Sequence, residues 1–118
     1  MENRYFLIEK KIKDLISYIN IYSKHLPKHE KYVLGEKLRR LSYEILELAI
    51  TVNKKVFKKT DLTQLNIKHE ILRQLVEVSY DLGYVDRVQR YHHLSLLIDE
   101  LGKMIGSWIK KLPKSGEN

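Results

Sequence analysis

Apolar residues recur along this chain at intervals of three and four, the spacing that places side chains on one face of an α-helix. Four successive segments show the pattern, and they predict helices over residues 3–24, 27–57, 62–83 and 86–112. The second segment is the most regular, because its steps alternate strictly between four and three at Leu34, Leu38, Leu41, Ile45, Leu48 and Val52. Such a seam is typical of helices packed in a bundle.

Short breaks separate the four segments. Pro27 lacks an amide donor but fits the first turn of a helix, so the second helix is expected to begin there. Gly83 stands where a left-handed residue can end the third helix, Asp86 can cap the fourth, and Pro113 stops it. With links this short, the sequence predicts an all-α fold: a single domain over residues 1–118 that forms an up-down-up-down antiparallel four-helix bundle.

The seams also predict the core. We expect the buried side chains of the second and fourth helices to include Leu38, Leu41, Ile45, Leu48, Ile98, Leu101 and Ile105, and the apolar line of the third helix to be Leu65, Leu72, Leu75 and Leu82. So thin a bundle cannot hold all five of the tyrosines Tyr18, Tyr22, Tyr32, Tyr43 and Tyr80. Exposed tyrosines suit a protein interface and, less specifically, base stacking.

The composition narrows the class of protein. Of the 118 residues, 43% are hydrophobic, which is enough for a core, and none is cysteine, which excludes disulfide scaffolds, thiol nucleophiles and thiolate metal sites. No segment has the character of a signal peptide or a membrane span, and we expect a cytoplasmic protein. The formal net charge of +7 favours binding to polyanions.

The positive charge gathers at one end of the expected bundle. Antiparallel helices bring the starts of the first and third helices together with the ends of the second and fourth. This lysine-rich end carries three acidic residues and eight basic ones, a net +5: Arg4, Lys54, Lys55, Lys58, Lys59, Lys110, Lys111 and Lys114. We expect nucleic acid to bind there through phosphate contacts. Lysines near helix C-termini also complement the helix dipole, which would be sufficient for Lys54 and Lys55 alone.

Motifs for catalysis or metal binding are missing from the sequence. None of the five histidines follows a carboxylate by three residues, the spacing of di-metal sites in helical bundles. A Gly-rich phosphate loop, a Gly-x-Ser-x-Gly turn and a His-Glu-x-x-His motif are also absent. Glu36, Arg40 and Glu44 lie four residues apart, where ion pairing on the helix surface accounts for them better than catalysis. We therefore expect no enzyme, no cofactor and no metal.

Gly102 and Gly106 leave one face of the fourth helix without two side chains. A glycine inside a helix costs about 1 kcal/mol relative to alanine, so a compensating contact is expected at each position. That contact is either packing within the chain or, as we favour, a contact between subunits of an oligomer.

Three stretches, spread over nearly the whole chain, carry a family pattern. They are Leu26-Pro27-Lys28-x-Glu30-Lys31-Tyr32-x-Leu34-Gly35 with Arg39 behind it, Leu82-Gly83-Tyr84, and Leu97-Ile98-Asp99-Glu100-Leu101-Gly102-Lys103-x-x-Gly106-Ser107-Trp108. Together they resemble the accessory variability determinant family of diversity-generating retroelements. Ser107 stands where that family has the second glycine of Gly-Gly-Trp, and Lys31 stands where arginine is common.

The resemblance implies a homopentameric barrel of four-helix protomers. Such a barrel binds RNA and DNA and docks the element's reverse transcriptase during mutagenic copying of a template repeat into a variable gene. The chain would be a non-catalytic accessory protein, with Lys31, Arg39 and Arg40 as contacts to the polymerase or to RNA. The first alternative is the protein encoded by intervening sequences in ribosomal RNA genes, which shares the bundle and the Leu-Pro start of the second helix. The remaining alternatives, in descending order, are a generic helical adaptor and a metal-dependent enzyme.

Overall fold

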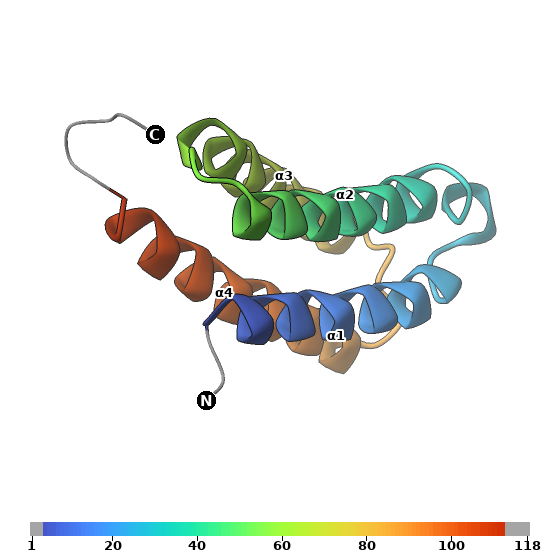
Figure 1. The fold of residues 1–118 in the computed structure, drawn as a ribbon. Coiled ribbons are helices and arrows are strands. Elements are labelled where there is room, and N and C mark those ends of the chain that lie inside the picture. The colour runs from blue at the N-terminus through green and yellow to red at the C-terminus, as the bar shows by residue number, and fades with distance from the viewer. Residues whose placement is uncertain (1–3, 113–118) are drawn as a thin grey trace.

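The computed structural model describes residues 4–112, with side chains from Leu7 onward, and this part of the chain is all-α. It forms four long helices and one short 3-10 helix (Figure 1): α1 Arg4–Lys24, η1 Lys28–Glu30, α2 Leu34–Lys54, α3 Lys59–Asp81 and α4 Val88–Lys110. No strand occurs between residues 4 and 112. None of the helices described here combines the length and the hydrophobicity that crossing a membrane requires.

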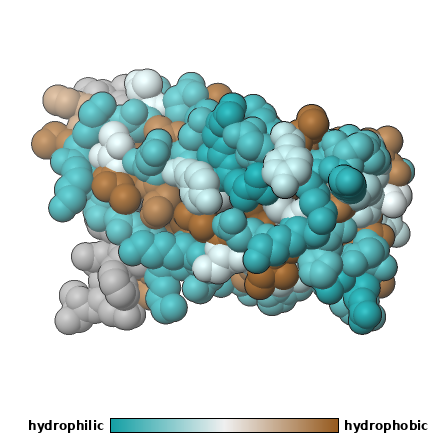
Figure 2. Space-filling model, turned by 90° about the vertical axis from the view of Figure 1, so that its right-hand side faces the viewer, coloured by the Kyte–Doolittle hydropathy of each residue, from teal (hydrophilic) through white to brown (hydrophobic). Residues whose placement is uncertain are grey.

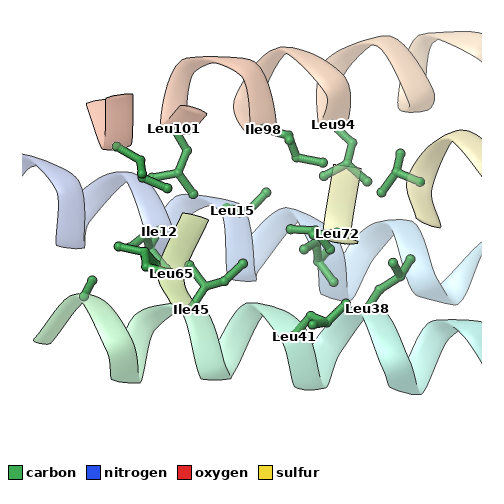
Figure 3. Close-up of a cluster of buried hydrophobic side chains, with 14 of the residues drawn as sticks. Ile12, Leu15, Leu38, Leu41, Ile45, Leu65, Leu72, Leu94, Ile98 and Leu101 are labelled. Carbon is green, nitrogen blue, oxygen red and sulfur yellow. The ribbon is translucent and has the colours of Figure 1, made fainter. Parts of the chain in front are cut away.

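Each long helix packs mainly against two others. α1 lies against α2 and α4, and α3 also lies against α2 and α4. Their apolar stripes meet in one core, where side chains from all four helices point toward one another (Figure 3). The seams predicted much of this core correctly, because six of the seven expected side chains are at most 2% exposed: Leu38, Leu41, Ile45, Ile98, Leu101 and Ile105.

Leu65 and Leu72 of α3 are also buried as predicted. Two predicted core positions, Leu48 and Leu82, are wrong for different reasons. Leu48 packs against the core but is only partly buried, because Ala49 occupies the core position on that turn of α2. Leu82 is 58% exposed, since it follows α3 as its C-cap residue. The buried face of α3 includes two polar residues that an apolar pattern cannot reveal: it consists of Leu62, Leu65, His69, Leu72, Val76 and Ser79.

The helix ends differ from the prediction most at the start of α2. Pro27 precedes a short 3-10 helix, and α2 begins only at Leu34. A side chain explains the late start, because a carboxylate oxygen of Glu30 accepts a hydrogen bond from the backbone N–H of Leu34 at 3.3 Å and so caps the first turn. The other carboxylate oxygen of Glu30 accepts a hydrogen bond from the Tyr84 hydroxyl at 3.0 Å. Glu30 therefore ties this turn to the link between α3 and α4.

The remaining ends lie within a few residues of the prediction. α2 ends at Lys54, before the expected residue 57, and Gly83 has the predicted left-handed conformation, with φ at +76°. Asp86 does not cap α4, which begins at Val88. Its carboxylate accepts hydrogen bonds of 2.9 Å from Arg90 instead. The predicted stop at Pro113 lies outside the described residues.

Candidate nucleic-acid interface

Residues 55–58, the 55–58 link, connect α2 to α3. Because α2 ends at Lys54, Val56 and Phe57 are outside the helix, and their side chains are 79% and 67% exposed. Four lysines flank them in the sequence: Lys54, Lys55, Lys58 and Lys59. Sequence reasoning missed Val56 and Phe57 as surface residues because it assigned them to the last turn of the second helix. The sequence signal that could have revealed them is an aromatic residue, Phe57, within a run of lysines.

Two of these lysines stabilise the local fold. The ammonium group of Lys58 donates hydrogen bonds of 2.6 Å to the carbonyl oxygens of Val52 and Lys55, at the C-terminal end of α2. Lys55 itself pairs with Asp61 of α3, with 2.8 Å between Nζ and Oδ2. These contacts agree with the helix-end role that the sequence left open for its lysines, although they involve Lys58 rather than Lys54.

The other lysines of the lysine-rich end point into solvent. Lys54, Lys59, Lys110 and Lys111 are exposed, and none has an ion-pair partner among the residues that the structure describes. Figure 1 shows the last turn of α4 and the first turn of α1 at the same end of the molecule as the 55–58 link. The side chain of Arg4 and the whole of Lys114 lie outside the described residues. These four lysines are therefore the predicted binding residues that remain available to a ligand.

Lys31, in the connection between α1 and α2, and Arg39, on the second turn of α2, line a common hollow. Arg39 packs on Gly35, because a Cβ at residue 35 would lie 3.3 Å from Arg39 Nη1. The same position would be 3.4 Å from Leu26 Cδ1. Gly35 thus lets the start of α2 approach both Arg39 and Leu26, the residue that precedes Pro27.

Arg40 lies outside this hollow and pairs with Glu36 one turn earlier, as the sequence predicted, with 2.5 Å between Nη2 and Oε2. Glu44, the third member of the predicted series, pairs instead with Lys68 of α3 at 3.2 Å. Within residues 7–112, no three His, Cys, Asp or Glu side chains come close enough to hold a metal ion together.

Gly102 has a packing partner within the chain. A Cβ at this residue would lie 2.8 Å from Cε1 of His69, a buried side chain whose Nε2 is 2.8 Å from the carbonyl oxygen of Ile98. The carbonyl can only accept, so Nε2 carries the hydrogen. Apart from the adjoining backbone of α4 and the two neighbouring residues, no atom of the described residues lies within 4 Å of a Cβ built on Gly106, so this position has open space beside it. The subunit contact at these glycines stays a prediction, and Gly106 is the position with space for it.

Comparison with known proteins agrees with the resemblance seen in the sequence. A family model described as bAvd-like matches residues 6–112, which is almost the whole of the described chain. A comparison with curated proteins finds no match. The matched range contains the 55–58 link, the hollow beside Gly35 and all three family stretches. The chain therefore belongs to the bAvd-like family, of the accessory variability determinant type.

Proposed function

We propose that the protein is a non-catalytic accessory protein of a diversity-generating retroelement. In this role it binds the element's reverse transcriptase and template RNA or DNA through a basic surface, and it supports mutagenic reverse transcription and retrohoming in the cytoplasm. Membership of the bAvd-like family supports this role. The proposal includes an up-down-up-down antiparallel order of the helices and assembly of the protomers into a homopentameric barrel.

The nucleic-acid part of the proposal rests on one observation, the exposure of the 55–58 link. Val56 and Phe57 project from it, and the exposed ammonium groups of Lys54 and Lys59 stand on either side. Lysine binds phosphate as a point charge, and an aromatic ring offers a face on which a base can stack. Stacking needs an unpaired base, so the link suits single-stranded RNA or DNA better than a duplex.

Assembly would strengthen this binding. In a ring of identical protomers the lysine-rich ends lie on one face, and their fields add. Phosphate contacts release counterions, so affinity should fall steeply as salt is raised. Lysine contacts to phosphate carry no base information, so little sequence preference is expected.

Fluorescence anisotropy with a labelled single-stranded RNA tests the proposal. The double variant Lys54→Glu/Lys59→Glu removes the two free cations beside the link and leaves Lys55 and Lys58 to hold it. The matched control is Lys13→Glu/Lys103→Glu, which changes the net charge equally at exposed positions of α1 and α4.

The proposal predicts a much larger loss of affinity for the link variant than for the control. Phe57→Ala should lower affinity by roughly five- to a hundredfold, the effect of losing one stacked base. Equal losses from the two charge variants would show that the link is the wrong surface. Circular dichroism checks that every variant keeps its helices.

A further inference from the structure

The hollow beside Gly35 lies between the last turns of α1 and the start of α2, and it encloses about 270 Å³. Three cations and three uncharged polar side chains line it: Lys24, Lys31, Arg39, Asn20, Ser23 and Tyr32. No carboxylate is among these lining residues. Figure 2 views the molecule from the side that carries the connection between α1 and α2, and hydrophilic side chains cover most of this face.

The three cations of the hollow have no ion-pair partner in the described part of the chain, and the acidic residues close to Lys31 and Arg39 in the sequence, Glu30 and Glu36, are engaged elsewhere. Glu30 accepts hydrogen bonds from the backbone of α2 and from Tyr84, and Glu36 pairs with Arg40. Three positive charges around one concave surface repel one another, and an anion bound between them would remove that repulsion. The hollow therefore carries the positive charge that favours binding of an anion.

Gly35 leaves room for the guanidinium of Arg39 at this site. The bare backbone of Gly35 lets Arg39 Nη1 lie 3.3 Å, and Ser23 Cβ 3.4 Å, from where a Cβ would stand. The guanidinium is therefore packed against α2 and only partly exposed, in contrast to the free lysines at the 55–58 link. A guanidinium presents several N–H donors to the oxygens of a phosphate, which is a stronger arrangement than a single ammonium group.

Tyr32 adds a second chemistry to the hollow. Its side chain is 82% exposed, the highest value among the large hydrophobic residues of residues 7–112. An aromatic ring beside a phosphate site is the combination by which proteins hold a single strand, since the backbone meets the cations and the adjacent base meets the ring. An acidic peptide would use the cations but would not need the ring.

We propose that this hollow binds one phosphate group of a single-stranded nucleic-acid backbone, with Arg39 as its main donor, Lys24 and Lys31 as supporting charges, and Tyr32 stacked on the neighbouring base. The inference rests on the proposed function in taking nucleic acid as the ligand. It adds a second contact point away from the 55–58 link, because Arg39 lies on the second turn of α2 and the link begins after Lys54 at its end, about 22 Å further along a helix that rises 1.5 Å per residue. A strand of RNA held at both points would lie along the bundle.

Binding of labelled single-stranded RNA at several salt concentrations tests the site with a matched pair of variants. Arg39→Gln removes the charge inside the hollow, and Lys37→Gln removes one charge from an exposed position of α2 outside it. Arg39→Gln should weaken binding roughly tenfold, the lower range for losing a charge-assisted hydrogen bond, and reduce the slope of log affinity against log salt by about 0.7. Lys37→Gln should change affinity less than twofold and Arg39→Lys should recover part of the loss, while thermal unfolding checks the fold of each variant.

Amide NMR with inorganic phosphate tests the hollow as a phosphate site independently of the proposed function. Phosphate should shift the resonances of residues 31–35 in the wild-type protein and not in Arg39→Gln. If the wild type binds RNA and Arg39→Gln binds as well as Lys37→Gln, this site is wrong and the proposed function stands. If phosphate shifts these resonances but RNA does not bind at all, nucleic acid is the wrong source of the phosphate. The absence of any shift would overturn the phosphate site itself.

Discussion

Tyr22 of α1 and Ser79 of α3 share a hydrogen bond of 2.6 Å inside the core. Each of these helices packs mainly on α2 and α4, so the bond crosses the bundle between two helices that are not neighbours. Ser79 Oγ is also 2.6 Å from the carbonyl oxygen of Val76, which can only accept. Ser79 therefore donates to Val76, and the Tyr22 hydroxyl donates to Ser79. Burial is the main cause that raises the pKa of Tyr22.

This geometry predicts unequal costs for the two partners. Ser79→Ala leaves the buried Tyr22 hydroxyl without its acceptor and should lower the free energy of unfolding by about 1–3 kcal/mol. Tyr22→Phe leaves Ser79 bonded to Val76 and should cost only about 1 kcal/mol. Urea denaturation of the two single variants and the double variant measures the coupling, and a double variant equal to the sum of the singles would contradict it.

Burial of the α2 seam makes a second prediction. Leu41 is 2% exposed, so Leu41→Ala should lower the free energy of unfolding by about 2–5 kcal/mol. Leu82→Ala makes the same chemical change at a side chain that is 58% exposed, and it should stay within about 0.5 kcal/mol of the wild type. Equal unfolding midpoints for the two variants would mean that the seam is not buried as described.

The sequence was sufficient to predict the four helices, because the apolar spacing that indicates a helix is local and repeats at every turn. Apolar spacing identified all four helices and most of the seam of α2, since each turn adds an independent observation. On α3 it predicted the buried Leu65 and Leu72 correctly. It missed His69 and Ser79, which occupy core positions and form hydrogen bonds with Ile98 and Tyr22. Such positions depend on a partner far away in the sequence, and periodicity cannot show that partner.

The candidate sites were harder to predict, because the partners of their side chains are also set by the fold. Counting charges identified the lysine-rich end but could not show that Lys58 caps α2, because that depends on where the helix stops. The motif around Gly35 singled out Lys31 and Arg39 without showing that Lys24 joins them at one hollow. Charge at a surface can be counted from the sequence, whereas its partners depend on the fold.

The two glycines of α4 should respond oppositely to alanine. Gly102→Ala places a Cβ 2.8 Å from His69, which must move and lose its bond to Ile98, so the protomer should lose about 1–3 kcal/mol of stability. Gly106→Ala meets open space and should gain about 0.5–1 kcal/mol from helix propensity. Thermal unfolding of both variants checks the order, and a more stable Gly102→Ala would contradict the packing on His69.

Light scattering tests assembly. The proposed homopentamer has five times the protomer mass of 14.1 kDa. If the open face at Gly106 is part of the subunit contact, Gly106→Ala should lower the assembled fraction even though it stabilises the protomer. A 14.1 kDa species for the wild type at micromolar concentration would rule assembly out.

The lowered pKa of Glu70 predicts how its ion pair with Arg73 contributes to stability at acidic pH. Hydrogen bonds from Arg73, with a further one from Gln74, lower the pKa of this carboxyl from 4.5 to about 2. Because the pKa is lower in the folded state, the stabilisation is present above about pH 4.5 and is lost as the pH falls toward 2. Arg73→Gln should return the pKa of Glu70 toward 4.5, as followed by NMR of the side-chain carboxyl carbon. An unchanged titration would show that the pair does not persist in solution.

Purification of the protein from its native host, followed by identification of what comes with it, tests the central claim most directly. The account predicts that a reverse transcriptase and its template RNA co-purify with the wild type, and that Lys54→Glu/Lys59→Glu loses RNA while Lys13→Glu/Lys103→Glu retains it. Recovery of ribosomal precursor RNA, with no reverse transcriptase, would contradict the retroelement role and favour a protein of the ribosomal intervening-sequence type.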